Sequence, residues 1–190
     1  MELILASASP RRHELLDAAG VKHSVLPTDA DETLPDNTEP QEAVMLLSRR
    51  KADAALASGK VPADAVVVAA DTVVLANGEI FGKPKDEADA RRMLSALSGG
   101  THDVYTGITV TNRDKTYTEY EVTHVTVRRI KDSEIDRYIE SGEPFGKAGA
   151  YAIQGRASKF ITRIDGDYTN VVGLPVAHTC VLAADLGADI

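Results

Sequence analysis

The 190-residue sequence contains a single cysteine, Cys180, and no tryptophan. One cysteine excludes an internal disulfide framework and any zinc site built from paired cysteines, so we expect a reducing compartment. No apolar run approaches the roughly 20 residues that cross a membrane. The apolar run over residues 3–8 is too short for a signal peptide and has no basic leader. These absences predict a cytoplasmic protein that does not bind a membrane.

The sequence also lacks an excess of basic residues. Lysine and arginine number 21 against 29 aspartates and glutamates, which gives a formal net charge of −8 at pH 7. Binding to nucleic acid through its phosphates needs a basic face, so this balance argues against DNA or RNA as a partner. There is no Walker-type phosphate loop and no Gly-x-Gly-x-x-Gly motif, and the histidines show no helical pair at metal-binding spacing. P-loop NTPases, Rossmann enzymes and histidine-based metal sites are therefore not supported.

Apolar runs and helical patterns alternate along the chain without a linker, which predicts one domain over residues 1–190. The pattern indicates an α/β fold, a mixed sheet with flanking helices. We expect strands at 2–6, 66–75, 102–111 and 116–130, and a last hairpin made of 160–164 and 168–172. We expect helices at 10–19, 40–57, 133–140 and about 175–186, with a further helix capped by Asp86 and ended by Gly99.

The segment Ser7-Ala8-Ser9-Pro10-Arg11-Arg12 lies where the first strand turns into the first helix. The free N–H groups and the dipole at a helix start attract anions, and arginines can bind phosphate oxygens in pairs of hydrogen bonds. Two arginines in a first turn oppose the dipole, which makes more sense with an anionic ligand present. The alternative is a helix capped by Ser9 whose arginines are only solvated.

Asp71 lies inside the apolar run Val-Val-Val-Ala-Ala-Asp-Thr-Val-Val-Leu. A carboxylate is costly to bury there unless a metal, a cation or several donors meet it. Such a group could act as a general base or bind a metal ion. The alternative is a structural cap or ion pair at a strand end.

Other polar residues stand apart from obvious solvated faces. Lys51 shares a helical face with Val44 and Leu47, and Lys83 lies in the turn Gly82-Lys83-Pro84. Together with the two arginines they supply the charge that a triphosphate pocket requires, although a lone lysine usually extends to water. Gln154 could bind a base edge or only hold its loop. The acidic residues Asp29, Asp31 and Glu32 are solvated loop charges unless one of them binds magnesium or a sugar hydroxyl.

Six motifs, read in order, resemble the Maf family of nucleoside triphosphate pyrophosphatases. They extend from about residue 3 to 180 and occupy residues 5–12, 70–74, 82–84, 97–102, 147–155 and 170–175. The resemblance implies an elongated, two-lobed fold like that of inosine triphosphate pyrophosphatases, with a central cleft. It also implies hydrolysis between the α and β phosphates with Mg²⁺ or Mn²⁺.

The resemblance further implies a role for individual residues. Ser7, Arg11, Arg12, Lys51 and Lys83 would hold the phosphates, with Lys83 also serving catalysis. Asp71 would be the catalytic carboxylate, and Asp71 and Glu32 would hold the metal, with Glu32 also in the substrate cleft. Gln154 matches a position associated with substrate choice.

The version Ala-Tyr-Ala-Ile-Gln-Gly of the glycine-rich loop is similar to the branch that acts on dTTP, UTP and modified pyrimidine nucleotides. Gly146 stands where the family often has aspartate, which weakens a metal site on that loop. The resemblance implies a role in cleaning the nucleotide pool or in arresting division, and a possible homodimer. The alternatives are a nucleotide-sensing regulator of septum formation without turnover, the 7-methyl-GTP branch, and a phosphatase that releases orthophosphate.

Overall fold

The computed structural model describes residues 1–190 and contains a seven-stranded sheet in the order β2-β1-β3-β5-β6-β7, with β4 paired to β3. Strand β1 is parallel to β2 and β3, whereas β4 pairs antiparallel with β3 and β7 with β6. The predicted mixed sheet with flanking helices is confirmed. The strands are β1 (Leu3–Leu5), β2 (Ser24–Val25), β3 (Val66–Ala76), β4 (Glu79–Phe81), β5 (Thr101–Thr111), β6 (Thr116–Val127) and β7 (Ile161–Asp165).

The helices follow the predicted positions with one exception, described below. They are α1 (Pro10–Ala18), α2 (Pro40–Ala57), α3 (Glu87–Leu97), α4 (Asp132–Glu140), α5 (Tyr168–Val172) and α6 (Val176–Asp185), with 3-10 turns η1 (Ala148–Ala150) and η2 (Arg156–Phe160). None of them combines the length and the apolar character needed to cross a bilayer.

Contacts between residues divide the chain into two compact units. The first unit contains Met1–Asp71, Thr106–Glu121 and Gly173–Ile190, and the second contains Thr72–Tyr105 and Val122–Val172. Strands β3, β5 and β6 each contribute residues to both units. The single domain over 1–190 stays a prediction.

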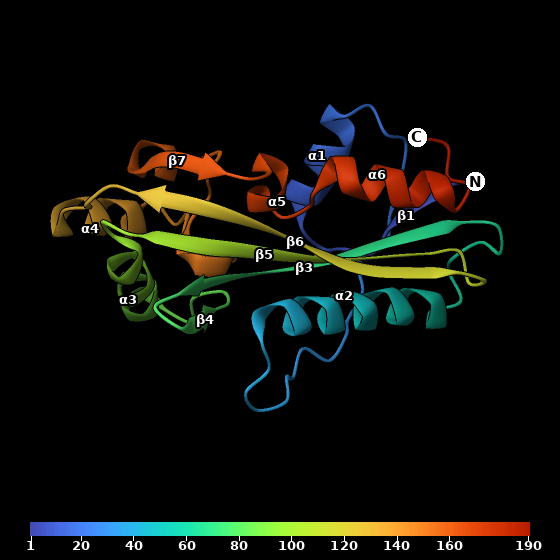
Figure 1. Ribbon diagram of the computed structural model, residues 1–190, viewed down its shortest axis with the longest axis horizontal. Helices are drawn as coiled ribbons and strands as arrows, with labels where there is room; N and C mark the ends of the chain where they lie inside the picture. Colours follow the sequence, from blue (N-terminus) through green and yellow to red (C-terminus); the bar gives the residue numbers. More distant parts are fainter. The chain divides into compact units, whose positions relative to one another are not determined.

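The first unit is built on alternating side chains of β1 and β3. Leu5 and Val68 belong to an apolar cluster with residues of α1 and α6, while Ile4 and Val67 belong to a second cluster with residues of α2. Figure 1 shows α1 and α6 on one face of these strands and α2 on the other. Strands covered on both faces read as continuous apolar runs, which is why β3 was recognisable from the sequence.

Gly107 of β5 fixes how closely α2 approaches the sheet. A side chain at this position would collide with the backbone of Val44 in α2. Lys51 lies two helical turns beyond Val44 on the same face of α2, so this close approach also directs Lys51 toward the sheet.

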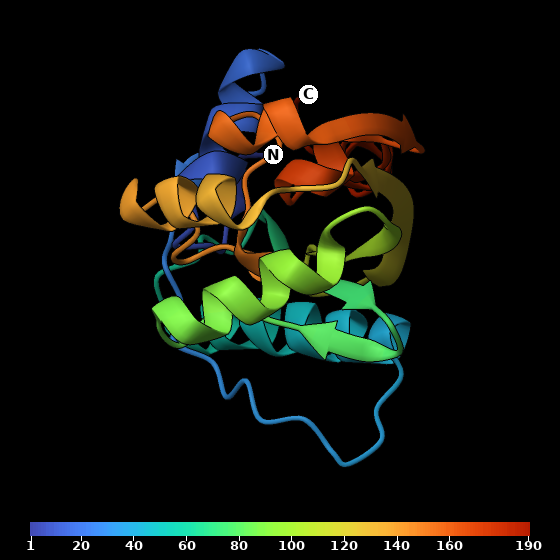
Figure 2. The same cartoon turned by 90° about the vertical axis from the view of Figure 1, so that its left-hand side faces the viewer.

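The second unit begins with the hairpin of β3 and β4. Asn77 and Gly78 adopt φ values of 52° and 77°, the left-handed pair typical of a tight hairpin turn with the sequence Asn-Gly. Asp86 caps α3 by accepting a hydrogen bond from the backbone N–H of Asp89 at 2.8 Å. Helix α3 packs beside α4, as Figure 2 shows in green and gold.

The prediction of a strand over residues 168–172 is wrong, because this segment forms helix α5. Asp167 Oδ1 accepts from the backbone N–H of Thr169 at 2.6 Å and from its hydroxyl at 2.8 Å, which starts a helix. The fully buried Asn170 then donates to the carbonyl of Val104 at 3.1 Å and to Thr123 Oγ1 at 2.9 Å. These side-chain bonds outweigh the strand preference of the valines that follow.

Candidate active site

Lys51 brings two carboxylates together in the first unit. Its ammonium nitrogen lies 2.6 Å from Asp71 Oδ1 and 3.0 Å from Glu32 Oε1. The Lys51 and Asp71 side chains are 15% and 13% exposed, whereas Glu32 is 56% exposed. Helix α2 supplies the lysine, β3 the aspartate, and the loop between β2 and α2 the glutamate. The sequence leaves a metal, a cation or several donors open as the partner of Asp71, and in this structure the partner is the cation Lys51.

Arg12 is buried at the start of α1, and its side chain donates hydrogen bonds to Gly173 and Ser7. Its Nε donates to the carbonyl of Gly173 at 2.7 Å, and its Nη1 donates to Ser7 Oγ at 3.3 Å. Burial lowers the pKa of Arg12 to about 10, an effect opposed by the negative charge of Asp71. The guanidinium stays charged at neutral pH, and its field reaches Asp71 and Glu32.

The N-terminus of α1 is open in the sense that no side chain caps it. Ser9 occupies the predicted cap position, but its side chain makes no capping hydrogen bond; its backbone N–H donates to Ser7 Oγ at 3.1 Å. The neighbouring Arg11 is half-buried, and burial lowers its pKa. Uncapped backbone donors, the helix dipole and two arginines at one helix start favour an anion there.

The acidic residues of the loop between β2 and α2 have different partners. Glu32 contacts Lys51, whereas Asp31 accepts from the backbone N–H of Thr33 at 2.9 Å. Arg50 donates to the carbonyls of Asp31 and Thr33 at 3.1 and 2.5 Å, which holds the loop against α2. The candidate site in the first unit therefore combines three cations, Arg11, Arg12 and Lys51, with two carboxylates, Asp71 and Glu32.

Lys83 and Gln154 belong to the second unit, and both are exposed. Lys83 lies in the corner between β4 and α3, and Gln154 follows the buried residues Tyr151–Ile153. The two motifs are joined, because Gly149 N donates to the carbonyl of Gly82 at 3.1 Å. Gly149 has a φ of 69°, and a Cβ there would lie 2.8 Å from a methyl of Val74, so only glycine fits.

Glu143 and Tyr138 hold the loop that carries Gln154. The Tyr138 hydroxyl donates to Glu143 Oε1 at 2.9 Å and accepts from the backbone N–H of Ala152 at 3.2 Å. Glu143 Oε2 accepts from the backbone N–H of Arg156 at 3.0 Å. The same carboxylate fills the space beside Gly155, where a Cβ would lie 2.5 Å from its Oε1. The loop is thus fixed on both sides of Gln154.

His102 and Tyr151 form a buried pair under the same loop. His102 Nε2 lies 2.7 Å from the Tyr151 hydroxyl, and the rings meet edge to face. Burial lowers the pKa of His102 to about 4 and raises that of Tyr151, so both are neutral at pH 7. The second nitrogen of His102, Nδ1, is buried without a hydrogen-bond partner.

Sequence reasoning missed Gly173, Glu143 and His102. Gly173 acts through its backbone carbonyl, which no residue type reveals, although it lies in one of the recognised motifs. In the sequence, Glu143 and His102 cannot be distinguished from ordinary polar residues, because their partners are distant in sequence or are backbone groups.

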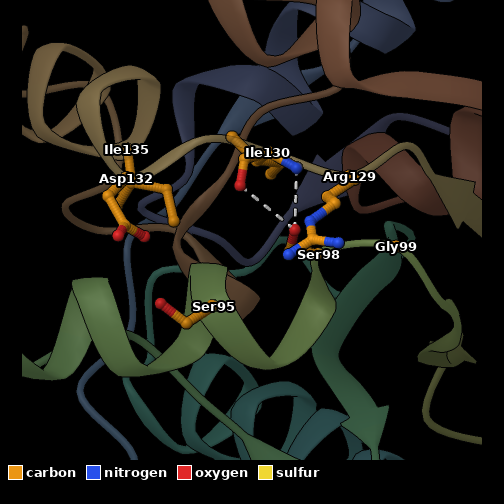
Figure 3. A pocket seen from close by; sticks show the side chains of 7 residues that line it. All are labelled: Ser95, Ser98, Gly99, Arg129, Ile130, Asp132 and Ile135. Atoms are coloured by element: carbon orange, nitrogen blue, oxygen red, sulfur yellow. Dashed lines mark hydrogen bonds between the residues drawn. The ribbon is translucent and has the colours of Figure 1, made fainter.

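A surface pocket of the second unit contains none of the predicted site residues. It lies beside the C-terminus of α3 and the segment before α4, where Ser98 Oγ accepts from Ile130 N at 2.7 Å (Figure 3). Its lining consists of Ser95, Ser98, Gly99, Arg129, Ile130, Asp132 and Ile135. No cluster of titratable groups suited to catalysis faces it.

Comparison with known proteins identifies the chain's relatives. The family model described as Maf-like protein matches residues 2–186. The chain belongs to the Maf family. Several Maf relatives are similar along nearly the whole chain. A dTTP/UTP pyrophosphatase of Agathobacter rectalis is 48% identical, covering 100% of this chain and 99% of that protein. A dTTP/UTP pyrophosphatase of Bacillus pumilus is 48% identical, covering 94% and 93%.

Among solved structures, the Ham1 protein of Staphylococcus aureus matches this Maf chain with a TM-score of 0.46 and 17% identity. The match covers 67% of this chain and 72% of that one.

Proposed function

We propose that this chain hydrolyses dTTP, UTP and modified pyrimidine nucleotides to the nucleoside monophosphate and pyrophosphate. The observation that carries the proposal is the buried Lys51–Asp71 pair with Glu32, in the same unit as the arginines at the open start of α1. Family membership and the names of the similar relatives support the same chemistry. Action in the cytoplasm, on free nucleotides and without a nucleic acid partner, belongs to the proposal, as does a possible homodimer.

Arg11 and Arg12, with Ser7 and the backbone donors of α1, would bind the phosphates. A triphosphate carries about four negative charges, and binding it takes several fixed cations. Arg12 is fixed in advance by the carbonyl of Gly173 and by Ser7, so little reorganisation is needed when the anion arrives. In the proposal Lys83 adds a further positive charge against the phosphates.

Asp71 would act on the attacking water. It would take one proton from the water as the oxygen bonds to the α-phosphorus and the bond to the bridging oxygen breaks, so that pyrophosphate leaves. Lys51 would hold the Asp71 carboxylate in place and stabilise the negative charge that builds up on the phosphates.

The donor set fits a divalent metal. Mg²⁺ and Mn²⁺ prefer oxygen ligands and usually bind one or two carboxylates together with substrate phosphates. Asp71 and Glu32 meet at one cation in this structure, namely the Lys51 ammonium. These two residues would hold the ion, which would supply additional positive charge to the phosphates when bound. Gly146 offers no side-chain ligand on the glycine-rich loop.

Gln154 would select the base. Its amide has both donor and acceptor groups, and the loop that presents it is fixed by Glu143 and Tyr138. A fixed amide can discriminate between base edges because a mismatched base leaves its polar groups unpaired. The cellular role would be to clean the nucleotide pool or to arrest division.

The test is a product assay with Mg²⁺ or Mn²⁺ on dTTP, UTP, CTP, GTP, ATP and 7-methyl-GTP, scoring pyrophosphate and orthophosphate separately. The proposal predicts pyrophosphate, with dTTP or UTP turned over fastest. Release of orthophosphate would instead identify a phosphatase, and preference for 7-methyl-GTP would place the chain in that branch. Tight binding without turnover would support a nucleotide sensor and remove Asp71 from any catalytic role.

A further inference from the structure

Two histidines and an aspartate meet on the surface of the first unit, in a cluster formed by α1 and the segment that follows it. His13 and Asp17 are one turn apart on α1, with His13 Nε2 3.2 Å from Asp17 Oδ2. His23 lies just before β2, and its Nε2 is 2.7 Å from His13 Nδ1. One ligand atom from each of the three residues lies within 4.8 Å of the others.

If both histidines are neutral, the hydrogen bonds of this cluster cannot all form, because one proton or other cation is missing. His23 Nδ1 lies 2.8 Å from the carbonyl of Val21, which can only accept, so Nδ1 carries a proton. In a neutral His23 the Nε2 that faces His13 is then an acceptor, and His13 Nδ1 must donate to it. A neutral His13 therefore presents an acceptor, Nε2, to the Asp17 carboxylate, which also only accepts. A proton or a metal ion resolves this conflict.

We propose that His13 Nδ1 and His23 Nε2 form a binding site for a borderline divalent cation such as Zn²⁺. A metal ion would replace the proton between the two nitrogens. His13 could then carry its proton on Nε2 and donate to Asp17, while His23 keeps its bond to Val21. A ligating imidazole that donates its other N–H to a carboxylate or a carbonyl is the usual arrangement at metal sites. Both acceptors are already in place here.

The required movement is small. Bonds of about 2.0–2.1 Å to a tetrahedral ion separate two nitrogens by roughly 3.3 Å, compared with 2.7 Å between His13 and His23. His13 is exposed and His23 half-buried, so both rings can adjust by this amount, and water would complete the coordination. The ion would tie α1 to the segment that leaves it.

This site differs in chemistry from the carboxylate pair Asp71 and Glu32. Imidazole nitrogens favour Zn²⁺, Cu²⁺ and Ni²⁺, whereas carboxylate oxygens suit Mg²⁺ and Mn²⁺. The sequence-based expectation that the histidines form no metal pair considered only their spacing on one helix. His23 is brought to His13 by the turn after α1, and Asp17 rather than a second histidine occupies the position one turn along.

The experiment is Zn²⁺ titration of the nucleotide-free protein by calorimetry at pH 7.5, with the His13→Ala, His23→Ala and Asp17→Asn variants. We expect wild-type protein to bind Zn²⁺ with an affinity that falls at least about 10-fold in either histidine variant. Asp17→Asn should weaken binding by roughly 10-fold, because the acceptor that orients His13 loses its negative charge. An excess of Mg²⁺ should not displace the zinc.

The control is His124→Ala, because His124 is exposed and faces a carboxylate, Asp103, but has no second histidine beside it. This variant should bind Zn²⁺ like the wild type. In the NMR spectrum, zinc should shift the imidazole signals of His13 and His23 first. Equal binding in His13→Ala, His23→Ala and wild type, or no binding in the wild type, would overturn the proposal. A first shift at His178, which faces Glu119 and Glu121, would overturn it as well.

Discussion

The two units of the molecule hold their polar groups in different ways. The first unit buries charges: Arg12, Lys51 and Asp71 are largely removed from water, and the arginine and lysine are satisfied by specific partners. The second unit fixes the Gln154 loop with backbone hydrogen bonds and with the neutral pair His102 and Tyr151. Buried charges are a costly way to stabilise a fold, whereas hydrogen bonds between neutral groups can hold a loop at a lower cost of desolvation. In the proposed function, the first unit would perform the chemistry and the second unit would select the base.

Replacing Asp71 of the first unit with asparagine has the largest expected effect, which is on turnover. The change keeps the shape and removes the negative charge, so we expect turnover to fall at least ~10²-fold, as for loss of a general base. Steady-state kinetics with dTTP would measure it, with circular dichroism to verify the fold. Near-normal turnover would remove Asp71 from the mechanism.

Lys51→Met tests how much the buried ion pair of the first unit contributes to the free energy of unfolding. The variant leaves Asp71 without its partner in a site where only 13% of that side chain is exposed. We expect the free energy of unfolding to fall by about 2 kcal/mol, because an unpaired buried charge remains.

The matched control for Lys51→Met is Arg49→Met, which breaks the exposed pair with Asp53 on the same helix. An exposed pair of this kind contributes about 0.5 kcal/mol or less. Urea denaturation would compare the two variants, and equal losses would show that the Lys51 pair is no more than a surface ion pair.

The neutral network of the second unit predicts a pH effect on stability. Burial lowers the pKa of His102 to about 4, so between that value and the ordinary 6.5 the unfolded chain binds a proton that the folded chain does not. The contribution to stability is complete above pH 6.5 and is lost as the pH falls toward 4. Between pH 8 and pH 5.5 this amounts to about 1.4 kcal/mol.

His102→Gln should flatten the dependence of unfolding free energy on pH over that range. His124→Gln, which replaces an exposed histidine, should leave it unchanged. If the slope is the same in wild type and His102→Gln, His102 is not held neutral by the fold.

Gln154→Ala gives the smallest expected effect. It distinguishes a role in choosing the base from a role in the hydrolysis itself. Loss of a hydrogen bond to the base corresponds to about 0.5–1.5 kcal/mol, so the ratio of kcat/KM between dTTP and GTP should change by about 2- to 13-fold. Ser158→Ala, an exposed change in the turn that follows, should leave that ratio unaltered. An equal loss on every nucleotide would mean that Gln154 only supports its loop.

The sequence predicts residues whose signal is local. Helix α2 spans Pro40–Ala57 as expected, because Pro40 suits a first helical position and its apolar spacing places Lys51 on the inner face. Asp71 was evident because a charge interrupts an otherwise apolar strand. The resemblance to the family, based on six ordered motifs, supplied the expected activity and agreed with the roles that the residues themselves suggest for Lys83 and Gln154.

Features set by long-range contacts could not be predicted. Helix α5 was mistaken for a strand, because its formation depends on bonds from Asn170 to Val104 and Thr123 as well as on the local cap at Asp167. The pairing of His13 with His23 and the support of Arg12 by the Gly173 carbonyl likewise arise only when the chain is folded. Hydropathy and spacing contain no information on such partners.

The most direct test of the central claim is hydrolysis of dTTP in water enriched with ¹⁸O, followed by mass spectrometry of both products. Attack at the α-phosphorus predicts that the label enters dTMP and that pyrophosphate stays unlabelled. Label in pyrophosphate, or orthophosphate as the labelled product, would contradict the account.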